Sequence, residues 1–327
     1  MHKKVRKKVY LHEMVSLRYL LQHLEKFAVF DLSEKFKREK LIHRLVCSVH
    51  FLLMYSLIVG HLWSTITRAS RHPQELIQAT LEDLILISIG IAVLYFKTHS
   101  TEIIQLMTIM ESFSRANMSI LMKYNRYSKI VLLTIFCLIF CAFNGHILEA
   151  LYPVADDDLK IRQIVYRTRH PERKHPFDVR IPFVDESKSW VYEIVFLLQV
   201  YTIFVLICFT TLIITVLPVI IVHMRGQYDM LATFIEKIGE KHLDSFGFQI
   251  YYTNIEINAS YYVMMEKRCK DSSKQMFRRI RAYERSYLKQ IIQFHQKLLM
   301  FQEKVGILFQ LTLLSLGTAS RNSGPQR

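Results

Sequence analysis

The chain has 327 residues, of which 51% are hydrophobic, and it carries a formal net charge of +15. With only 9 glycines and 7 prolines, the composition favours long helices and argues against a disordered or sheet-rich chain. We find no phosphate-binding, dinucleotide-binding or metalloprotease motif in the sequence, so we expect neither an enzyme nor a cofactor. The basic residues lie beside apolar runs, which indicates a membrane protein and no nucleic-acid partner.

Residues 1–44 form a polar, basic segment whose charges exclude a cleaved signal peptide. Leu17, Leu21 and Leu24 recur in this segment at helical spacing. We expect an amphipathic helix that lies on the cytosolic side of a membrane.

Four apolar runs follow in residues 45–224, and we interpret each as a membrane-spanning helix. The spans are predicted at about 45–63, 76–96, 130–151 and 191–224. The fourth run is longer than the roughly 20 residues that a crossing needs, so its helix should continue beyond the membrane. Pro218 lies late in this run and predicts a kink or a helix end near the membrane surface.

In the second span, Glu82 and Asp83 precede the most apolar part, residues 84–96. Carboxylates inside a membrane are functional candidates. We expect these two at a helix end that is exposed to water.

Residues 225–297 are basic but show the periodicity of two amphipathic helices, which we interpret as cytosolic extensions of the flanking spans. One apolar stripe is Tyr228, Leu231, Ile235 and Ile238, and the other is Ile280, Tyr283, Tyr287, Ile291, Phe294 and Leu298. The fifth apolar run, 298–317, is of borderline length for a crossing. Residues 318–327 are a polar tail without a structural signal.

Residues 1–44, the polar connector 97–129 and residues 225–297 together hold 30 Lys and Arg, against 12 in residues 64–83, 152–190 and the tail. The positive-inside rule then places the N-terminus in the cytosol and the long charged loop 152–190 outside. The glycosylation sequons at Asn117 and Asn258 would both face the cytosol and stay unmodified. The predicted fold is an all-α polytopic membrane helical bundle with cytosolic helix extensions.

The outer halves of the third and fourth spans combine aromatic and aliphatic residues with a few polar groups. Such a mixture suits a pocket for a small, mostly apolar ligand, and ordinary helix packing is the alternative for each residue. The candidate pocket residues are Phe140, Phe143, Asn144, Ile147, Tyr192, Phe196, Gln199, Val200 and Ile203, with His146 beside them.

Three segments resemble the insect odorant receptor family. Ile181–Tyr201 is similar to the entry into the fourth span of that family, with a Tyr-Glu-Ile sequence followed by a Gln. Val222–Gly239 resembles the segment that follows this span, and Leu288–Leu311 resembles the approach to the fifth span with a His-Gln pair. The combination and the order of the three segments carry the resemblance.

The resemblance implies a plasma-membrane subunit of a cation channel that small volatile odorants open. It also implies seven spans, a cytosolic N-terminus, and a hetero-tetramer with a shared co-receptor subunit. The family places its ligand pocket between the second, third, fourth and sixth spans, in the outer half of the membrane, and lines its pore with the seventh span.

The chain departs from the family after the fifth run, where residues 318–327 stand in place of further spans. We expect a truncated sequence, and conduction by this chain alone is not expected. Alternative interpretations are a gustatory-type chemoreceptor, a non-conducting truncated fragment, or a secondary transporter, which would show internal repeats and broken spans.

Overall fold

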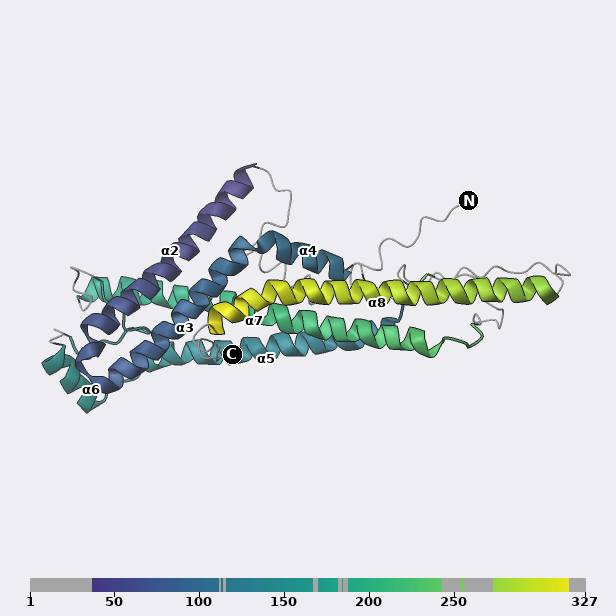
Figure 1. Cartoon of the computed structure of the whole chain (residues 1–327). Coiled ribbons are helices and arrows are strands. Elements are labelled where there is room, and N and C mark those ends of the chain that lie inside the picture. The colour runs from purple at the N-terminus through teal and green to yellow at the C-terminus, as the bar shows by residue number, and fades with distance from the viewer. Residues whose placement is uncertain are drawn as a thin grey trace, which may run out of the picture. The chain divides into compact units, whose positions relative to one another are not determined.

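The computed structural model describes residues 37–111, 113, 116–166, 170–181, 184, 188–242, 254–255 and 273–317. All regular structure in these residues is helical, and no strand occurs among them. The long helices, labelled in Figure 1, are α2 (Lys37–Thr67), α3 (Pro73–Thr98), α4 (Ser100–Glu111), α5 (Met118–Leu151), α7 (Ser189–Glu236) and α8 (Ser273–Gly317). Shorter helical segments are η2 (Ala69–Arg71), α6 (Asp156–Lys160) and η3 (Ile161–Val165). The predicted all-α membrane helical bundle is confirmed.

Four of these helices, α2, α3, α5 and α7, are long and apolar enough to cross a membrane. Each contains one of the four predicted spans. The fifth predicted span, 298–317, forms the end of α8, and its crossing stays a prediction. The N-terminal helix proposed within residues 1–36 and the sequon at Asn258 lie outside the described residues.

Helices extend into two places where the sequence predicted other structure. The expected polar connector 97–129 contains α4 and the first turns of α5, and the Asn117 side chain caps α5 by accepting hydrogen bonds from the amides of Ser119 (3.1 Å) and Ile120 (3.3 Å). The fourth-span helix does not end at Pro218 but continues to Glu236. A proline removes one donor, and the helical bonds on both sides of it still satisfy the surrounding backbone.

The chain divides into two compact units. The first, here the bundle unit, comprises residues 19–100 and 132–216. The second, here the α8 unit, comprises residues 1–18, 101–131 and 217–327. The helices α5 and α7 contribute to both units, because each is longer than a bilayer core requires.

In the bundle unit, α2 and α3 form an antiparallel pair (Figure 1). The hydroxyl of Tyr55 on α2 donates to the carbonyl of Gly90 on α3 at 3.2 Å. Gly90 allows this close approach, because a Cβ there would lie 3.0 Å from Ile58 Cδ1. The helix α2 also meets α7, where His50 Nε2 lies 2.8 Å from the Tyr201 hydroxyl.

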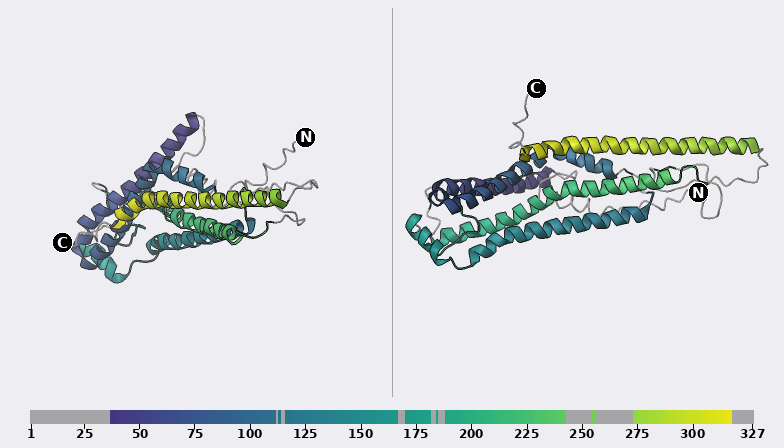
Figure 2. Two further views of the ribbon diagram at one scale, coloured as in Figure 1. Left: turned by 45° about the vertical axis from the view of Figure 1, so that its right-hand side comes forward. Right: turned by 60° about the horizontal axis from the view of Figure 1, so that its bottom comes forward.

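The core of the α8 unit is aromatic. The ring of Phe113 meets the rings of Phe294 and Phe301 at centroid distances of 6.4 and 5.1 Å. The Tyr287 hydroxyl donates to the Phe234 carbonyl at 2.9 Å and so ties α8 to the end of α7. Both views of Figure 2 show α8 as one long helix.

The two predicted stripes of this region have different outcomes. On α8, Tyr283, Tyr287, Ile291, Phe294 and Leu298 are buried. On α7 the predicted stripe is partly wrong. Leu231 is buried, but Ile235 and Ile238 are 49% and 45% exposed, and Met230 and Phe234 are buried instead. The helix ends at Glu236, so Ile238 lies beyond it and does not share a helical face with Leu231.

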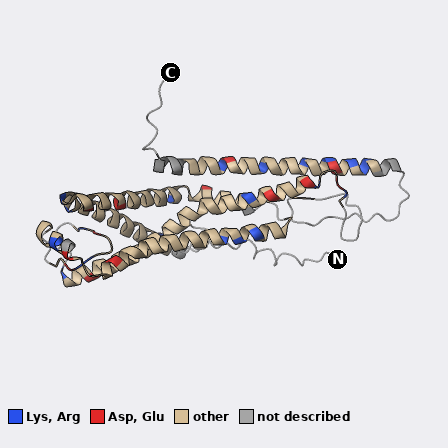
Figure 3. Cartoon of the chain, turned by 90° about the horizontal axis from the view of Figure 1, so that it is seen from below, with Lys and Arg blue, Asp and Glu red and all other residues tan. Residues whose placement is uncertain are grey.

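Charge is distributed as expected for a membrane protein. In Figure 3, Lys and Arg recur along α8, and long stretches of the other helices are free of charged residues. The bilayer core excludes unpaired charges, so these uncharged stretches are the parts suited to contact lipid.

Candidate functional site

The nine predicted pocket residues all lie in the bundle unit, four on α5 and five on α7. The two helices differ in burial, since 61% of the most apolar window of α7 is buried against 11% for α5. Gln199 and Ile203 are buried, and Tyr192, Phe196 and Val200 are half-buried. On α5, Phe143, Asn144 and Ile147 are half-buried and Phe140 is exposed. The helix α7 thus supplies the buried half of the predicted site.

The long loop, described over residues 152–166, 170–181, 184 and 188, includes α6 and η3 and contacts α7 at Tyr192. The Tyr192 hydroxyl donates to the Lys174 carbonyl at 2.9 Å. The Tyr192 ring lies 4.8 Å from the His175 ring and 5.9 Å from the Phe196 ring, and the Arg173 guanidinium lies 5.3 Å from its centroid. Tyr192 therefore anchors the long loop as well as facing the predicted site.

The two amides of the predicted site have different partners. Asn144 Nδ2 donates to the carbonyl of Phe140 on its own helix at 2.7 Å. Gln199 Oε1 accepts a hydrogen bond of 3.0 Å from the backbone amide of Phe177 in the long loop. Gln199 Nε2 is buried and has no hydrogen-bond partner within the described residues. Gln199 is thus the buried polar group of this site with an unused donor.

Phe177 fixes the long loop between three helices. Its ring lies 4.8 Å from the His146 ring on α5 and 6.1 Å from the His61 ring on α2. Its amide is held by Gln199 on α7. An aromatic ring buried among these partners covers the end of the bundle unit.

The loop also lies against α2 at Gly60. The Arg180 amide donates to the Gly60 carbonyl at 3.1 Å. A Cβ built on Gly60 would lie only 2.5 Å from Val179 Cγ1. Glycine is therefore required here by the close approach of the loop, and any side chain would displace Val179.

A cluster of one imidazole and two carboxyl groups joins α2 to α3 in the bundle unit. His61 Nδ1 lies 2.6 Å from Asp83 Oδ1, and His61 Nε2 lies 3.1 Å from Glu82 Oε2. The predicted water-exposed position of Glu82 and Asp83 is wrong for Asp83, which is only 5% exposed, and His61 is 1% exposed. The antiparallel pairing of α2 and α3 brings His61 and Asp83 together, because they lie equally far from the turn at His72. That symmetry was the signal in the sequence that could have found the pair.

A cavity of about 160 Å³ adjoins this cluster at the loop end of the bundle unit. Its charged and titratable lining residues are His61, Arg68, Glu75, Glu82, Glu149, Arg162, Tyr166, Lys174 and Asp178. Lys174 Nζ lies 3.5 Å from Glu149 Oε1, and Arg162 lies 3.7 Å from Asp178 Oδ1. A lining this polar suits water rather than an apolar ligand. Within the described residues, no group of three or more His, Cys, Asp and Glu side chains could hold a metal ion.

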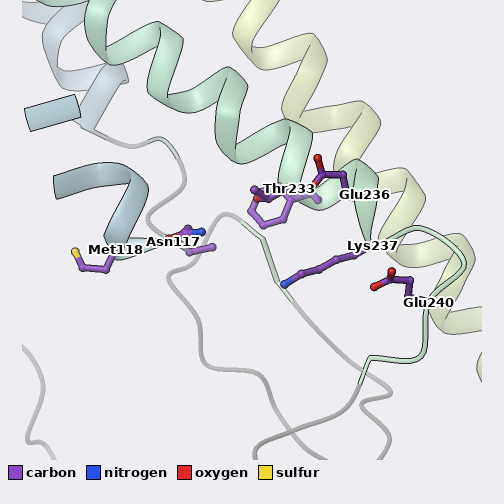
Figure 4. Close-up of a pocket in the computed structure, with 8 residues that line it drawn as sticks. Asn117, Met118, Thr233, Glu236, Lys237 and Glu240 are labelled. Atoms are coloured by element: carbon purple, nitrogen blue, oxygen red, sulfur yellow. The ribbon is translucent and has the colours of Figure 1, made fainter. Parts of the chain in front are cut away.

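A second cavity of about 410 Å³ lies in the α8 unit. Figure 4 shows Asn117 and Met118 from the start of α5, Thr233 and Glu236 from the end of α7, and Lys237 and Glu240 from the turn that follows. None of the nine predicted pocket residues lines either cavity. The larger cavity is therefore distinct from the predicted ligand site, and its lining is polar.

Four helices that are long and apolar enough to cross a membrane indicate a polytopic membrane protein. Comparison with known families gives the particular class. The family described as 7tm Odorant receptor matches residues 75–316, and the chain belongs to this insect odorant receptor family. No individual curated protein matches the chain. The family assignment made from the three sequence segments is confirmed.

Proposed function

We propose that this chain is an odorant receptor subunit of the plasma membrane that binds a small, volatile, mostly apolar molecule and gates a cation channel together with a co-receptor subunit. The observation that carries the proposal is the family match over residues 75–316. The family consists of receptors, and this accords with a sequence that contains no catalytic motif.

The ligand would bind between the α5 and α7 parts of the bundle unit. Its contacts would be Phe140, Phe143, Asn144, Ile147, Tyr192, Phe196, Gln199, Val200 and Ile203. The uneven burial of the two helices supports this location: α7 offers a buried wall, and the half-buried side chains of α5 offer a face that a small molecule can cover. The long loop over Phe177 would shield the bound ligand from water.

The N-terminus and residues 225–297, which include the basic first part of α8, would lie in the cytosol. The Lys and Arg residues along α8 support this orientation, because positive charge favours the cytosolic side. The loop 152–188 would then face outside, where an odorant arrives.

The co-receptor would contact an exposed apolar surface of α8. Leu288, Ile292, Leu299 and Met300 are between 45% and 60% exposed, although the opposite face of the helix is buried in the aromatic core. Exposed apolar residues that recur on one helix mark protein interaction surfaces.

The test is functional expression of the chain in cells with and without an insect odorant co-receptor, followed by calcium imaging and current recording against a panel of volatile compounds. We expect a response that needs both subunits and that weakens when Val200 or Ile203 is replaced by Ala. A response that is unchanged by every substitution at the nine positions would contradict the proposed ligand site. No response to any compound, with both subunits at the cell surface, would contradict the proposed function.

A further inference from the structure

The Gln199 side chain has a fixed orientation. The Phe177 backbone N–H can only donate, so the amide oxygen of Gln199 must face it, at 3.0 Å. The NH₂ group of Gln199 is then the half of the amide that does not bond to Phe177. This orientation follows from hydrogen-bond chemistry and does not depend on telling oxygen from nitrogen in the side chain.

The NH₂ group of Gln199 is a buried hydrogen-bond donor without an acceptor in the described part of the chain. Gln199 is only 4% exposed, and no residue in the described part of the chain accepts a hydrogen bond from Nε2. A buried donor without an acceptor is unfavourable, and native proteins retain few of them outside functional sites.

The surroundings of this donor on α7 are apolar. Val195, one turn before Gln199, and Ile203, one turn after it, are both buried, and Ile203 has no exposed surface. A molecule that met the Nε2 group would place one polar atom there and hydrocarbon along the helix on either side. The polar atom must be an acceptor, because Nε2 can only donate.

We propose that Gln199 Nε2 donates a hydrogen bond to the ligand and thereby selects small apolar molecules that carry one acceptor oxygen, such as ketones, aldehydes and esters, over hydrocarbons of the same shape. The inference rests on the proposed function, since it names the ligand class of that same site. A site that hydrogen-bonds its ligand rejects an analogue without the bonding atom more strongly than an apolar pocket rejects a change of shape. We expect a preference of about tenfold for the oxygen-bearing member of a matched pair.

The experiment uses the full chain, purified in lipid nanodiscs, and two pairs of probes that differ only in a carbonyl oxygen or a methylene group. The pairs are acetophenone with α-methylstyrene and 2-heptanone with 2-methyl-1-heptene. Dissociation constants are obtained from the ligand-dependent rise of the unfolding temperature. Both ketones should bind about tenfold more tightly than their partners.

Two substitutions separate the two roles of the Gln199 side chain, which are the NH₂ donor for the ligand and the oxygen that accepts from the Phe177 amide. Gln199→Glu keeps an oxygen for the Phe177 amide but removes the NH₂ donor, and Gln199→Met removes both. Each should reduce the ratio of the two dissociation constants to about one. Gly306→Ala is the control, because a Cβ at Gly306 meets nothing within 4 Å and this residue lies in the α8 unit, so the ratio should remain.

The outcomes distinguish the two proposals. If the wild-type chain binds both members of a pair equally, or if both Gln199 variants keep the preference, the inference is overturned and the proposed function stands. If neither member of either pair binds, the inference is overturned, and the proposed function is decided separately by the response to the panel of volatile compounds. Equal dissociation constants for the two members of a pair in the wild-type chain would overturn the inference without any variant. The inference therefore stays testable even if both Gln199 variants fail to fold.

Discussion

His61 on α2 holds Asp83 on α3 through a hydrogen bond of 2.6 Å between Nδ1 and Oδ1, and both side chains are buried. Removal of one partner from a buried charged pair leaves the other without compensation. We expect Asp83→Ala to lower the free energy of unfolding by about 3 kcal/mol, measured by denaturant titration in mixed micelles. Asp83→Asn keeps an oxygen for His61 and should cost less.

The control for this pair is Glu149→Ala, which removes an ion pair with Lys174 on the partly exposed rim of the cavity. Because Glu149 is 60% exposed, the loss should stay below about 1 kcal/mol. Equal losses for Asp83→Ala and Glu149→Ala would show that the buried cluster does not hold α2 and α3 together.

Gly60→Ala should detach the long loop from α2. The new Cβ would meet Val179 Cγ1 at 2.5 Å, and a branched side chain pinned by its neighbours has little room to move. We expect a loss of about 1–3 kcal/mol in unfolding free energy and faster cleavage of the loop by trypsin. Gly145→Ala is a matched control, because a Cβ at Gly145 meets nothing within 4 Å. Loop cleavage at the wild-type rate in Gly60→Ala would contradict the close contact.

Tyr124 and Asp229 should stabilise the α8 unit through one hydrogen bond between α5 and α7. The bond has a charged acceptor, so Tyr124→Phe should cost about 1.5–3 kcal/mol of unfolding free energy. Gly226→Ala should also destabilise this contact, since its Cβ would lie 3.0 Å from the Tyr124 ring. The neighbouring substitution Tyr127→Phe changes an exposed residue and should have little effect. A loss for Tyr127→Phe equal to that for Tyr124→Phe would mean that the measurement reports general damage.

Asn117 should remain unglycosylated in cells. The proposed orientation places it in the cytosol, where the glycosylation machinery does not reach, and its side chain caps α5. An engineered sequon in the long loop should acquire a glycan, visible as a mobility shift that a glycosidase reverses. A glycan on Asn117 together with none on the loop would reverse the proposed orientation.

The contact with the co-receptor should depend on the exposed apolar face of α8. Replacement of Leu288 and Ile292 together by Asp should abolish co-purification of a tagged co-receptor, because two charges would be buried in the interface. Arg281→Ala and Lys289→Ala together are the control, since they change the charge of the same helix without altering its apolar residues. Co-purification that survives the Asp substitutions would exclude this surface.

Much of the fold follows from local pattern. The apolar runs predicted α2, α3, α5 and α7, because a crossing helix must satisfy its backbone within itself and leaves a long uncharged stretch in the sequence. The stripe from Tyr283 to Leu298 predicted the buried face of α8, because helical periodicity marks a face whatever its partner. The family assignment also came from short segments of sequence, and the match over residues 75–316 confirms it.

The tertiary structure decided which polar groups meet. The sequence placed Glu82 and Asp83 at a helix end exposed to water, and only the antiparallel pairing of α2 and α3 brings them together with His61. Gln199 belonged to the predicted pocket, but its use of one amide atom for Phe177 depends on where the long loop lies. The helices and the buried face of α8 could be predicted from the sequence, because hydrophobicity and periodicity are properties of neighbouring residues along the chain. Hydrogen bonds between residues far apart in sequence depend on the packing of whole helices, which the local pattern does not contain.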